Sequence, residues 1–434
     1  MPRTRLARLA SELHNETLDI PFARPSTHYP AFDYRPPASF AVPQSLLELF
    51  MNASHRSLAS GLALAAFVLT PWLAFAAGST GIIYQDGFDP CEVGLDVDND
   101  RLDACLERAL GTDPFLADTD GDSINDGDEV LGTLDGLDLP ALGADPLVKN
   151  ILLEYDWFED DLDVPLHAHR PTQAMIDQVA AAFAAAPVTN PDGSTGIVVI
   201  QDFGQGGVFT GGNLIDDSDG VLVGGVLDSE FQDYKSNHFA TNRRGYFHYV
   251  LLPHRYNTDS NSSGQAELIG DDMIVSLYEY YDNVTYISNT IVHELGHNLG
   301  LLHGGNVSCN YKPNYNSVMN YRYQFPGVDD NCTVAGDGVL DYSSGAYITL
   351  DESNLDENAG ICGDVPIDWN EDGQIQTGVT ADINPNGNNA CFSTISNLHD
   401  HDDWGAIVFY GLSSANRRTA EIIDCQSSPM EAQD

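Results

Sequence analysis

The chain has 434 residues, enough for two or three domains, and its 42% hydrophobic share is ordinary for a globular protein. Its charge is extreme, because 18 Lys and Arg stand against 65 Asp and Glu, for a formal net charge of −47. Such a surface repels nucleic acid and anionic membranes, which excludes both as partners, and it suits bound calcium or a high-salt environment.

The N-terminal region allows two interpretations. An apolar run from Leu58 to Ala77 follows Met51 and ends in small residues typical of a signal-peptidase site. If translation begins at Met51, residues 51–77 are a signal peptide, and residues 1–50 are a non-native or disordered extension. Otherwise the run is an internal signal-anchor with residues 1–50 in the cytoplasm. We favour the first, which predicts a secreted protein without stable membrane association after cleavage.

The chain has seven cysteines, and none forms a Cys-x-x-Cys motif, which argues against a thiolate zinc ribbon or a thioredoxin-type site. All follow the export signal, which favours disulfides in an oxidising compartment. The sequence does not fix the pairing. We expect neighbours in sequence to pair, leaving one cysteine over: Cys91–Cys105, Cys309–Cys332 and Cys362–Cys391, with Cys425 unpaired.

Residues 78–146 form an acidic segment with regularly spaced carboxylates and a helix expected over residues 102–110. Alternating Asp in a loop surrounds a hard cation with oxygens, and Glu107 and Glu129 are each twelfth from the first Asp of their loop, as in an EF-hand. Arg101 and Ser123 occupy the place of the EF-hand glycine, so the pattern instead resembles thrombospondin type 3 calcium repeats. The alternative is a solvated acidic linker. The predicted ligands are Asp96, Asp98, Asp100, Glu107, Asp118, Asp120, Asp122, Asp126 and Glu129.

Residues 147–412 have the pattern of a globular α/β domain. We expect strands over residues 150–155, 196–201, 245–252 and 272–277. We expect helices over residues 172–186 and 290–301, and irregular structure over residues 204–226.

The stretch 291–305 reads Ile-Val-His-Glu-Leu-Gly-His-Asn-Leu-Gly-Leu-Leu-His-Gly-Gly. His293 and His297 share one face of a helix and can hold one metal ion, and Glu294 can reach a water molecule beside it. Gly300 can end the helix so that the chain turns back and brings His303 as a third ligand. Three imidazoles with one open position are typical of a catalytic zinc site. The alternative is a helix with three unrelated histidines.

The extended histidine motif resembles the metzincin clan of zinc metallopeptidases, and Ser317-Val-Met-Asn-Tyr321 resembles the Met-turn of that clan. The resemblance implies that Met319 packs below the zinc without binding it. Tyr321 is either a catalytic residue that donates to the oxyanion of the tetrahedral intermediate or a buried structural tyrosine. The resemblance also implies a twisted mixed sheet whose edge strand binds extended substrate.

The C-terminal part offers weaker signals. Asp368, Asn370 and Asp372 have the spacing of a calcium loop that lacks its final Glu. His399 and His401 precede an apolar stretch over residues 404–412, which we interpret as a helix capped by Asp402 and Asp403 rather than as a second metal site. Residues 413–434 form a polar tail.

The sequence therefore predicts an α/β metzincin-like domain with a zinc-motif helix and a C-terminal helix, preceded by a calcium-binding segment. The predicted function is that of a secreted, monomeric, zinc-dependent metalloendopeptidase with structural calcium ions. Its substrates would be proteins or peptides, and Glu294 would be the general base. One alternative is a calcium-dependent extracellular adhesion or binding protein with an inactive zinc site, and another is a zinc hydrolase acting on other bonds. Some metzincins block zinc with a pro-segment cysteine; Cys91 or Cys105 could do so, although a disulfide between them is the favoured fate.

Overall fold

The computed structural model describes residues 94–159, 168–258, 260, 262–277, 280–386, 390–391, 394–409 and 421–425. Of the two units into which the chain divides, every described residue belongs to the second unit, Ile83–Asp434. The predicted extension, the signal peptide, Cys91 and most of the polar tail lie outside the described residues. Among the residues that are described, no helix is long and apolar enough to cross a membrane.

The described part of the acidic segment, residues 94–146, contains three short helices, α2 (Ala104–Leu110), α3 (Asp126–Leu131) and α4 (Leu139–Leu142). The side chain of Asp103 caps α2 by accepting hydrogen bonds from the backbone amides of Cys105 and Leu106. Gly111, at φ 97°, ends the helix in the left-handed conformation that glycine adopts without strain. The helix predicted over residues 102–110 is therefore confirmed, whereas α3 and α4 were not expected.

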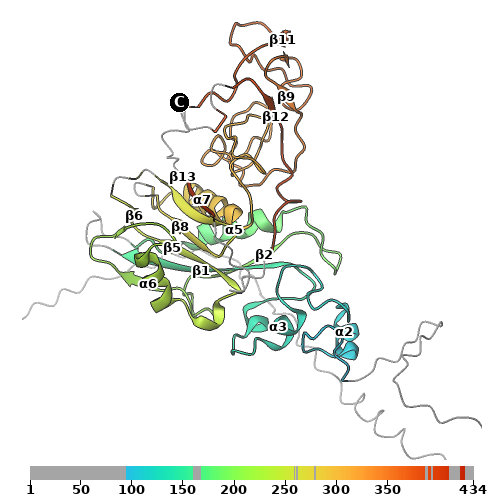
Figure 1. Ribbon diagram of the computed structural model, residues 1–434, viewed down its shortest axis with the longest axis vertical. Coiled ribbons are helices and arrows are strands. Elements are labelled where there is room, and N and C mark those ends of the chain that lie inside the picture. The colour runs from blue at the N-terminus through green and yellow to red at the C-terminus, as the bar shows by residue number, and fades with distance from the viewer. Residues whose placement is uncertain are drawn as a thin grey trace, which may run out of the picture. The chain divides into compact units, whose positions relative to one another are not determined.

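A mixed seven-stranded sheet lies at the centre of the second unit (Figure 1). Its strands follow the spatial order β13-β7-β8-β5-β1-β2, and β3 pairs with the end of β1. The strands from β8 to β2 run parallel, whereas β7 and β13 are antiparallel to their neighbours. The predicted mixed α/β class is thus confirmed. The bounds are β1 (Asn150–Glu159), β2 (Val198–Asp202), β3 (Leu214–Asp216), β5 (Phe247–Leu252), β7 (Gly264–Leu268), β8 (Asp272–Val275) and β13 (Glu421–Cys425).

Alternating side chains of β1 build a hydrophobic core on each face of the sheet, as the two-residue period of a strand requires. One core receives Leu153 and Tyr155 and contains side chains of helices α5 (Gln173–Ala184) and α7 (Val284–Asn298). The other receives Leu152 and Phe158 and contains side chains of α6 (Ser229–His238) and of the acidic segment. The sheet therefore packs against the zinc-motif helix on one side and against the acidic segment on the other.

Two elements next to the zinc motif differ from the sequence-based expectation. Helix α7 begins at Val284 rather than near residue 290, because the side chain of Asn283 caps it by accepting from the Tyr286 amide at 3.1 Å. Strand β7 was not expected, because Gly-Gln-Ala-Glu-Leu contains no β-branched residue. Pairing with β8 on one side and β13 on the other holds this segment extended.

The helix expected over residues 404–412 is absent from its described part, residues 404–409, so this prediction is wrong. The Asp402 side chain accepts from the Gly405 amide at 3.0 Å and caps only a single turn. The chain then extends, and the Val408 amide donates to the Leu299 carbonyl at 3.0 Å. Asp403 is buried and accepts from the Tyr315 hydroxyl instead of capping a helix.

The described residues between 306 and 400 contain little regular structure, and two disulfides connect them: Cys309–Cys391 and Cys332–Cys362. The predicted pairs Cys309–Cys332 and Cys362–Cys391 are therefore wrong. Pairing of β9 (Leu350–Asp351) with β12 (Asn397–Leu398) folds the chain back, which brings Cys391 toward Cys309 instead of its neighbour in sequence. Cys105 is also disulfide-bonded, and its predicted partner, Cys91, lies outside the described residues.

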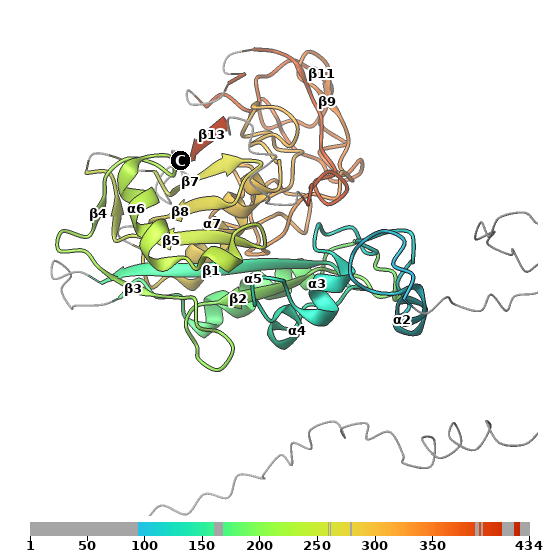
Figure 2. The ribbon, with the colours of Figure 1, turned by 60° about the horizontal axis from the view of Figure 1, so that its bottom comes forward.

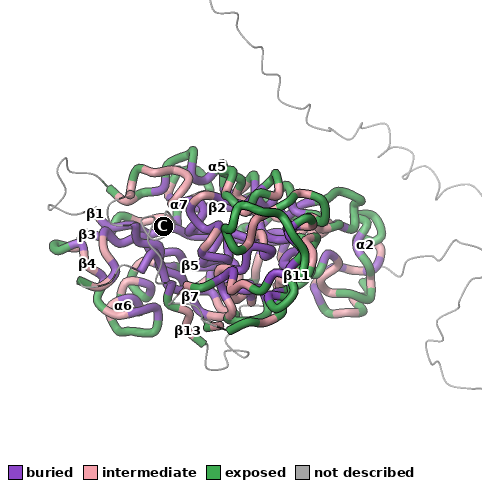
Figure 3. Tube along the Cα trace, turned by 90° about the horizontal axis from the view of Figure 1, so that it is seen from above, coloured by how far each residue is buried: buried purple, intermediate pink, exposed green. Residues whose placement is uncertain are grey.

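Five further short elements complete the described part of the chain. Strand β4 (Val221–Leu222) pairs in parallel with β6 (Arg255–Tyr256), and β10 (Leu355–Asp356) pairs antiparallel with β11 (Thr377–Val379). A 3₁₀ turn, η1, covers Thr241–Arg243. Figure 3 shows the buried trace concentrated along the central strands, whereas the loop around β11 is largely exposed.

Candidate metal centre

Three histidines converge at the end of α7. His293 and His297 are fully buried and lie one turn apart on the helix, and His303 comes from the loop that follows it. The Nε2 atoms of His297 and His303 are 3.2 Å apart, and the rings of His293 and His303 stack with centroids 5.3 Å apart. The structure thus brings together the three residues that the sequence motif singles out.

The end of α7 explains how His303 returns to the helix. Gly300 has φ 97°, its amide donates to the His297 carbonyl at 2.9 Å, and the Leu301 amide donates to the Gly296 carbonyl at 2.8 Å. These two bonds form a Schellman motif, which satisfies the last carbonyls of a helix and reverses the chain. A left-handed residue at position 300 is therefore what places His303 beside His297.

Backbone carbonyls fix the orientation of the two helical imidazoles. Nδ1 of His293 lies 2.7 Å from the Val318 carbonyl oxygen, and Nδ1 of His297 lies 2.7 Å from the Leu301 carbonyl oxygen. Because a carbonyl only accepts, each Nδ1 carries the proton and donates it, and each Nε2 keeps its lone pair. Burial lowers the pKa of His293 to about 4 and lowers the pKa of His297 and His303 well below the usual range. The three side chains are therefore neutral imidazoles, the form that binds metal ions.

Glu294 directs its carboxylate into the same centre. The side chain is fully buried, and its Oε1 atom has no hydrogen-bond partner among the described residues. Burial raises the pKa of Glu294 well above its usual value. The carboxylate fits because Gly264 of β7 has no side chain: a Cβ there would lie 2.4 Å from Glu294 Oε1. The absent side chain of a strand residue thus makes the space for the carboxylate.

The turn around Met319 lies directly against the zinc-motif helix. Met319 is fully buried, and its sulfur would lie 2.3 Å from a Cβ at Gly296, so a glycine in α7 is needed for this approach. The preceding residue supplies the carbonyl that orients His293. The ring of Tyr321 lies 4.3 Å from that of His303 between centroids. These placements are compatible with both roles weighed for Tyr321.

The centre has a fourth side chain that no sequence pattern predicted, Cys425, which is fully buried and forms no disulfide with a described cysteine. Its sulfur lies 3.3 Å from Nε2 of His293, 3.4 Å from Nε2 of His297 and 3.6 Å from Nε2 of His303. It also lies 3.4 Å from Oε2 of Glu294. The sequence did indicate that Cys425 is left over when the other six cysteines are paired. No sequence motif, however, links it to the three histidines.

These distances fit one tetrahedral zinc ion. Nitrogen ligands at about 2.0–2.1 Å and a sulfur ligand at about 2.3 Å from a tetrahedral ion lie about 3.4–3.6 Å from one another. The 3.2 Å between two nitrogens and the 3.3–3.6 Å between sulfur and nitrogens have this size. The three imidazoles and the thiol are also ligand types that zinc prefers. The donor set can therefore bind zinc with no change in backbone.

The acidic segment brings its carboxylates into two clusters, Asp96–Asp98–Asp100, extended by Glu107 and Asp126, and Asp118–Asp120–Asp122. Asp126 thus contacts the first cluster, although its sequence position suggests the second. Several carboxylate oxygens of the acidic segment are buried and have no hydrogen-bond partner in the described part of the chain. They are both oxygens of Asp98, Glu107 and Glu129, and one oxygen each of Asp100 and Asp120.

Burial and neighbouring carboxylates raise the pKa values of these acids. Burial, then Asp98 and Asp100, raise the pKa of Glu107 to about 7. Burial, then Asp122 and Asp120, raise the pKa of Glu129 to about 11. Buried, unpartnered and like-charged oxygens are costly unless a cation joins them. The clusters therefore offer the oxygen ligands that a hard cation would bind.

The loop with Asp368, Asn370 and Asp372 is different. Asn370 and Asp372 are exposed, and the carboxylate of Asp368 accepts from the amides of Asp372 at 3.2 Å and Gly373 at 2.7 Å. These contacts explain the Asp-x-Asn-x-Asp-Gly spacing as a hydrogen-bonded turn. Calcium binding at this loop stays a prediction.

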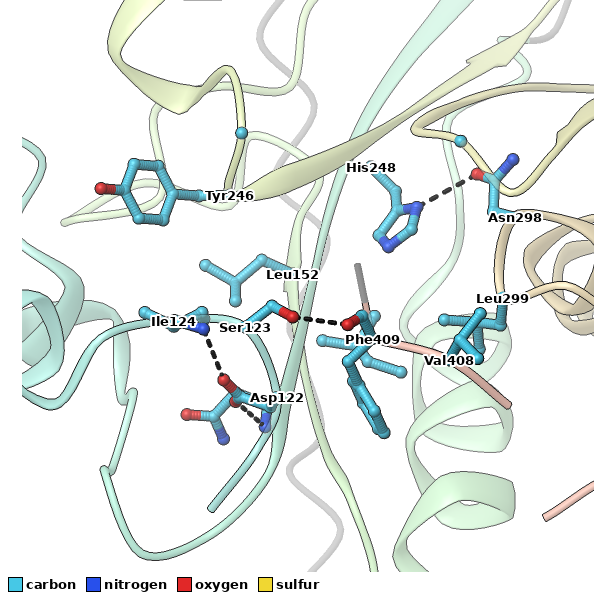
Figure 4. Close-up of a pocket in the computed structure, with 14 residues that line it drawn as sticks. Asp122, Ser123, Ile124, Leu152, Tyr246, His248, Asn298, Leu299, Val408 and Phe409 are labelled. Atoms are coloured by element: carbon cyan, nitrogen blue, oxygen red, sulfur yellow. Dashed lines mark hydrogen bonds between the residues drawn. The ribbon is translucent and has the colours of Figure 1, made fainter. Parts of the chain in front are cut away.

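Two other features could be taken for functional sites. Glu267, Asp271 and Asp272 lie close together, but buried Lys235 forms ion pairs with both aspartates and supplies the positive charge. A pocket between the acidic segment, the start of β1 and residues 408–409 is shown in Figure 4. It contains His248, hydrogen-bonded to Asn298 at 3.1 Å, but none of the three clustered histidines.

Comparisons with known proteins add little to this description. No family model matches the chain, and no curated protein matches it. Among solved structures, one match is archaemetzincin from Methanopyrus kandleri, with 17% identity and a TM-score of 0.24. The match covers 39% of this chain and 81% of that chain. A likeness at this level carries no argument, so the function of the centre has to be inferred from its own residues.

Proposed function

We propose that the chain is a zinc-dependent metalloendopeptidase whose active centre is formed by His293, His297, His303 and Glu294. The observation that carries the proposal is the convergence of three neutral imidazole nitrogens beside a buried carboxylate that has a free oxygen atom. A bound zinc ion would supply Lewis-acid chemistry and would lower the pKa of a water molecule at an open position. The metzincin resemblance of residues 293–303 and 317–321 points to the same reaction.

Each residue has a role that its environment supports. The two helical imidazoles are held by the carbonyls of Val318 and Leu301, so little reorganisation is needed on metal binding. Glu294 would accept a proton from the attacking water and deliver it to the leaving amine, because its buried Oε1 atom is not engaged by any described residue. Tyr321, beside His303, is placed to donate to the oxyanion.

A peptide substrate is favoured by the strand next to the centre. Helix α7 approaches β7 where Glu294 lies against Gly264, and β7 pairs on its other side from β8 with an extended, antiparallel segment, β13 (Figure 2). This edge can therefore hold a peptide through main-chain hydrogen bonds, which is the β-augmentation mode of recognition. We propose that a substrate binds along the same edge.

The remaining parts of the proposal concern calcium and secretion. Buried, unpartnered oxygens in the acidic segment favour structural calcium ions, held by Asp96, Asp98, Asp100, Glu107, Asp126 and by Asp118, Asp120, Asp122, Glu129. The apolar run before residue 78 and the disulfides favour export. A monomer acting outside the cell, where calcium is plentiful, fits these features.

The experiment that tests the reaction is Glu294→Gln. The variant should keep its zinc content and lose about 10²–10⁴-fold in kcat/KM for peptide cleavage, because the base is removed and the imidazoles stay. Because Cys425 fills the fourth position, the assay should use both the parent and the Cys425→Ser background. Exposed Glu371→Gln is the matched control and should behave as its background does. Equal turnover with and without Glu294 contradicts the assignment.

A second function is favoured by one observation. With Cys425 as a permanent ligand, the centre has four protein ligands and no open position, as in structural zinc sites. The chain would then be an extracellular binding or adhesion protein, stabilised by calcium and zinc. It would cleave no peptide in either background, and Cys425→Ser would lower stability without any gain of activity.

A further inference from the structure

We propose that Cys425 is a removable fourth ligand of the metal centre and that β13 is an inhibitory segment that keeps the peptidase latent. The proposal rests on the proposed peptidase function and adds its regulation. Two independent observations carry it: the position of one sulfur atom and the pairing of one strand.

The first observation is the position of the sulfur. The Cys425 sulfur lies 3.3–3.6 Å from all three histidine Nε2 atoms, so it occupies the remaining corner of a tetrahedron. It also contacts Oε2 of Glu294 at 3.4 Å and interacts with the Tyr321 hydroxyl. One side chain therefore covers the open position, the general base and the proposed oxyanion donor together.

The second observation is the strand that delivers the sulfur. β13 pairs antiparallel with β7 in continuous register, from Glu421 opposite Leu268 to Cys425 opposite Gly264. The Ser262 hydroxyl, which has one proton to donate, lies 2.7 Å from the Asp424 carboxylate and 3.0 Å from the Cys425 carbonyl oxygen. The segment thus lies as an extended peptide would lie, with its last residue at the metal centre.

The position at which Cys425 pairs with β7 shows why β13 and a bound peptide would exclude each other. It stands opposite Gly264, the strand residue whose missing side chain makes room for Glu294. A peptide bound to β7 would have to displace β13 to reach Glu294, since both use the same edge of the sheet. Substrate and β13 are therefore mutually exclusive, and the described arrangement is the latent one.

The alternative is a permanent structural zinc site, which would be expected to have different residues around its ligands. A structural zinc site has no use for a base or an oxyanion donor beside its ligands, and a buried carboxylate oxygen without a partner is a cost. Here Glu294 and Tyr321 both contact the ligand sulfur. This arrangement favours a ligand that leaves over one that stays.

The experiment compares parent, Cys425→Ser, Glu421→Gln and the double variant Cys425→Ser with Glu294→Gln, each loaded with zinc or with cobalt(II). Glu421 is exposed and lies on the same strand, so its variant is the matched control. The cobalt-loaded parent and control should show a thiolate-to-cobalt charge-transfer band, which Cys425→Ser should lack. With zinc, Cys425→Ser should cleave peptides at least about tenfold faster than the parent, as expected if less than about one tenth of the parent is open.

The outcomes separate this proposal from the peptidase proposal. If the band disappears and activity rises only where Glu294 is present, both proposals stand. If parent and Cys425→Ser cleave equally fast and the parent shows no thiolate band, latency is overturned and the peptidase stands. If the band disappears but neither protein cleaves peptides, Cys425 is a permanent ligand, and latency and the peptidase assignment both fail.

Discussion

The metal centre on α7 and the acidic segment are both clusters of ligands, but they are built on opposite principles. In the first, the imidazoles are neutral, and the two on α7 donate Nδ1–H to backbone carbonyls. In the second, carboxylates of like charge lie buried with unpartnered oxygens. Neutral ligands tolerate the absence of a cation, whereas crowded carboxylates do not. Zinc would therefore give activity to a domain that is already folded. Calcium, in contrast, would contribute to the stability of the folded state itself.

The largest expected effect follows from this contrast. Removal of calcium with a calcium-selective chelator should lower the free energy of unfolding by about 4 kcal/mol for each site that was filled at a thousandfold excess over its Kd. The loss should appear as a lower Tm and as protease cleavage within residues 94–146. Removal of zinc alone should change the Tm less. An equal decrease in Tm on removal of either metal would contradict this contrast between the two clusters.

Tyr321→Phe in the Cys425→Ser background tests the metal centre itself. If the hydroxyl stabilises the oxyanion, kcat should fall about 10²-fold with unchanged zinc content, the usual loss on removing one such donor. The Cys425→Ser background is needed because the hydroxyl otherwise interacts with the Cys425 sulfur. An unchanged kcat would leave Tyr321 as a structural residue that packs against His303.

Glu129→Gln tests the acidic segment. The substitution should raise the stability of the calcium-free protein and lower that of the calcium-bound protein. Without calcium, the amide removes a buried carboxyl group crowded by Asp120 and Asp122, so stability should rise by about 1–3 kcal/mol. With calcium, the variant should bind the ion more weakly and be less stable than the parent. Chemical denaturation in both states measures this reversal. Exposed Asp135→Asn is the matched control and should change stability little in either state.

A dependence on pH is expected in the calcium-free protein. Glu107, Asp120 and Glu129 have folded-state pKa values raised to about 7, 8 and 11 by burial and by neighbouring carboxylates. Each binds its proton more tightly when folded. Its stabilising contribution is therefore complete below the unfolded pKa of about 4 and is lost as pH rises toward the folded value. Stability should fall between pH 5 and pH 8 by at most about 1.4 kcal/mol per pH unit and group. With calcium bound, this fall should disappear.

Much of the metal centre could be predicted because its signal is local. His293, His297 and Gly300 lie within one helix and its end, so spacing alone places them. The first turn of α7 was missed because its cap is a side-chain bond that residue patterns do not show. β7 was missed for a related reason, since partners on both sides impose its conformation.

Long-range contacts account for the other errors. Cys425 reaches the histidines only through the pairing of β13 with β7, and no pattern within the segment indicates that pairing. The disulfides join cysteines that short strands bring together rather than neighbours in sequence. The expected C-terminal helix failed because Asp403 bonds to Tyr315 instead of capping a helix. In each case a contact between distant residues outweighs the local preference.

The carbonyls of Val318 and Leu301 have a consequence for how this centre can vary. An acceptor on the main chain persists whatever side chain stands at that position, so substitutions at 301 and 318 that keep the fold leave the imidazoles oriented. Insertions or deletions between residues 297 and 303 would shift the Leu301 carbonyl. Those around residue 318 would shift the Val318 carbonyl. The centre should therefore tolerate substitutions at positions 301 and 318 but lose its geometry when the lengths of these loops change. Surface loops, in contrast, usually tolerate insertions and deletions.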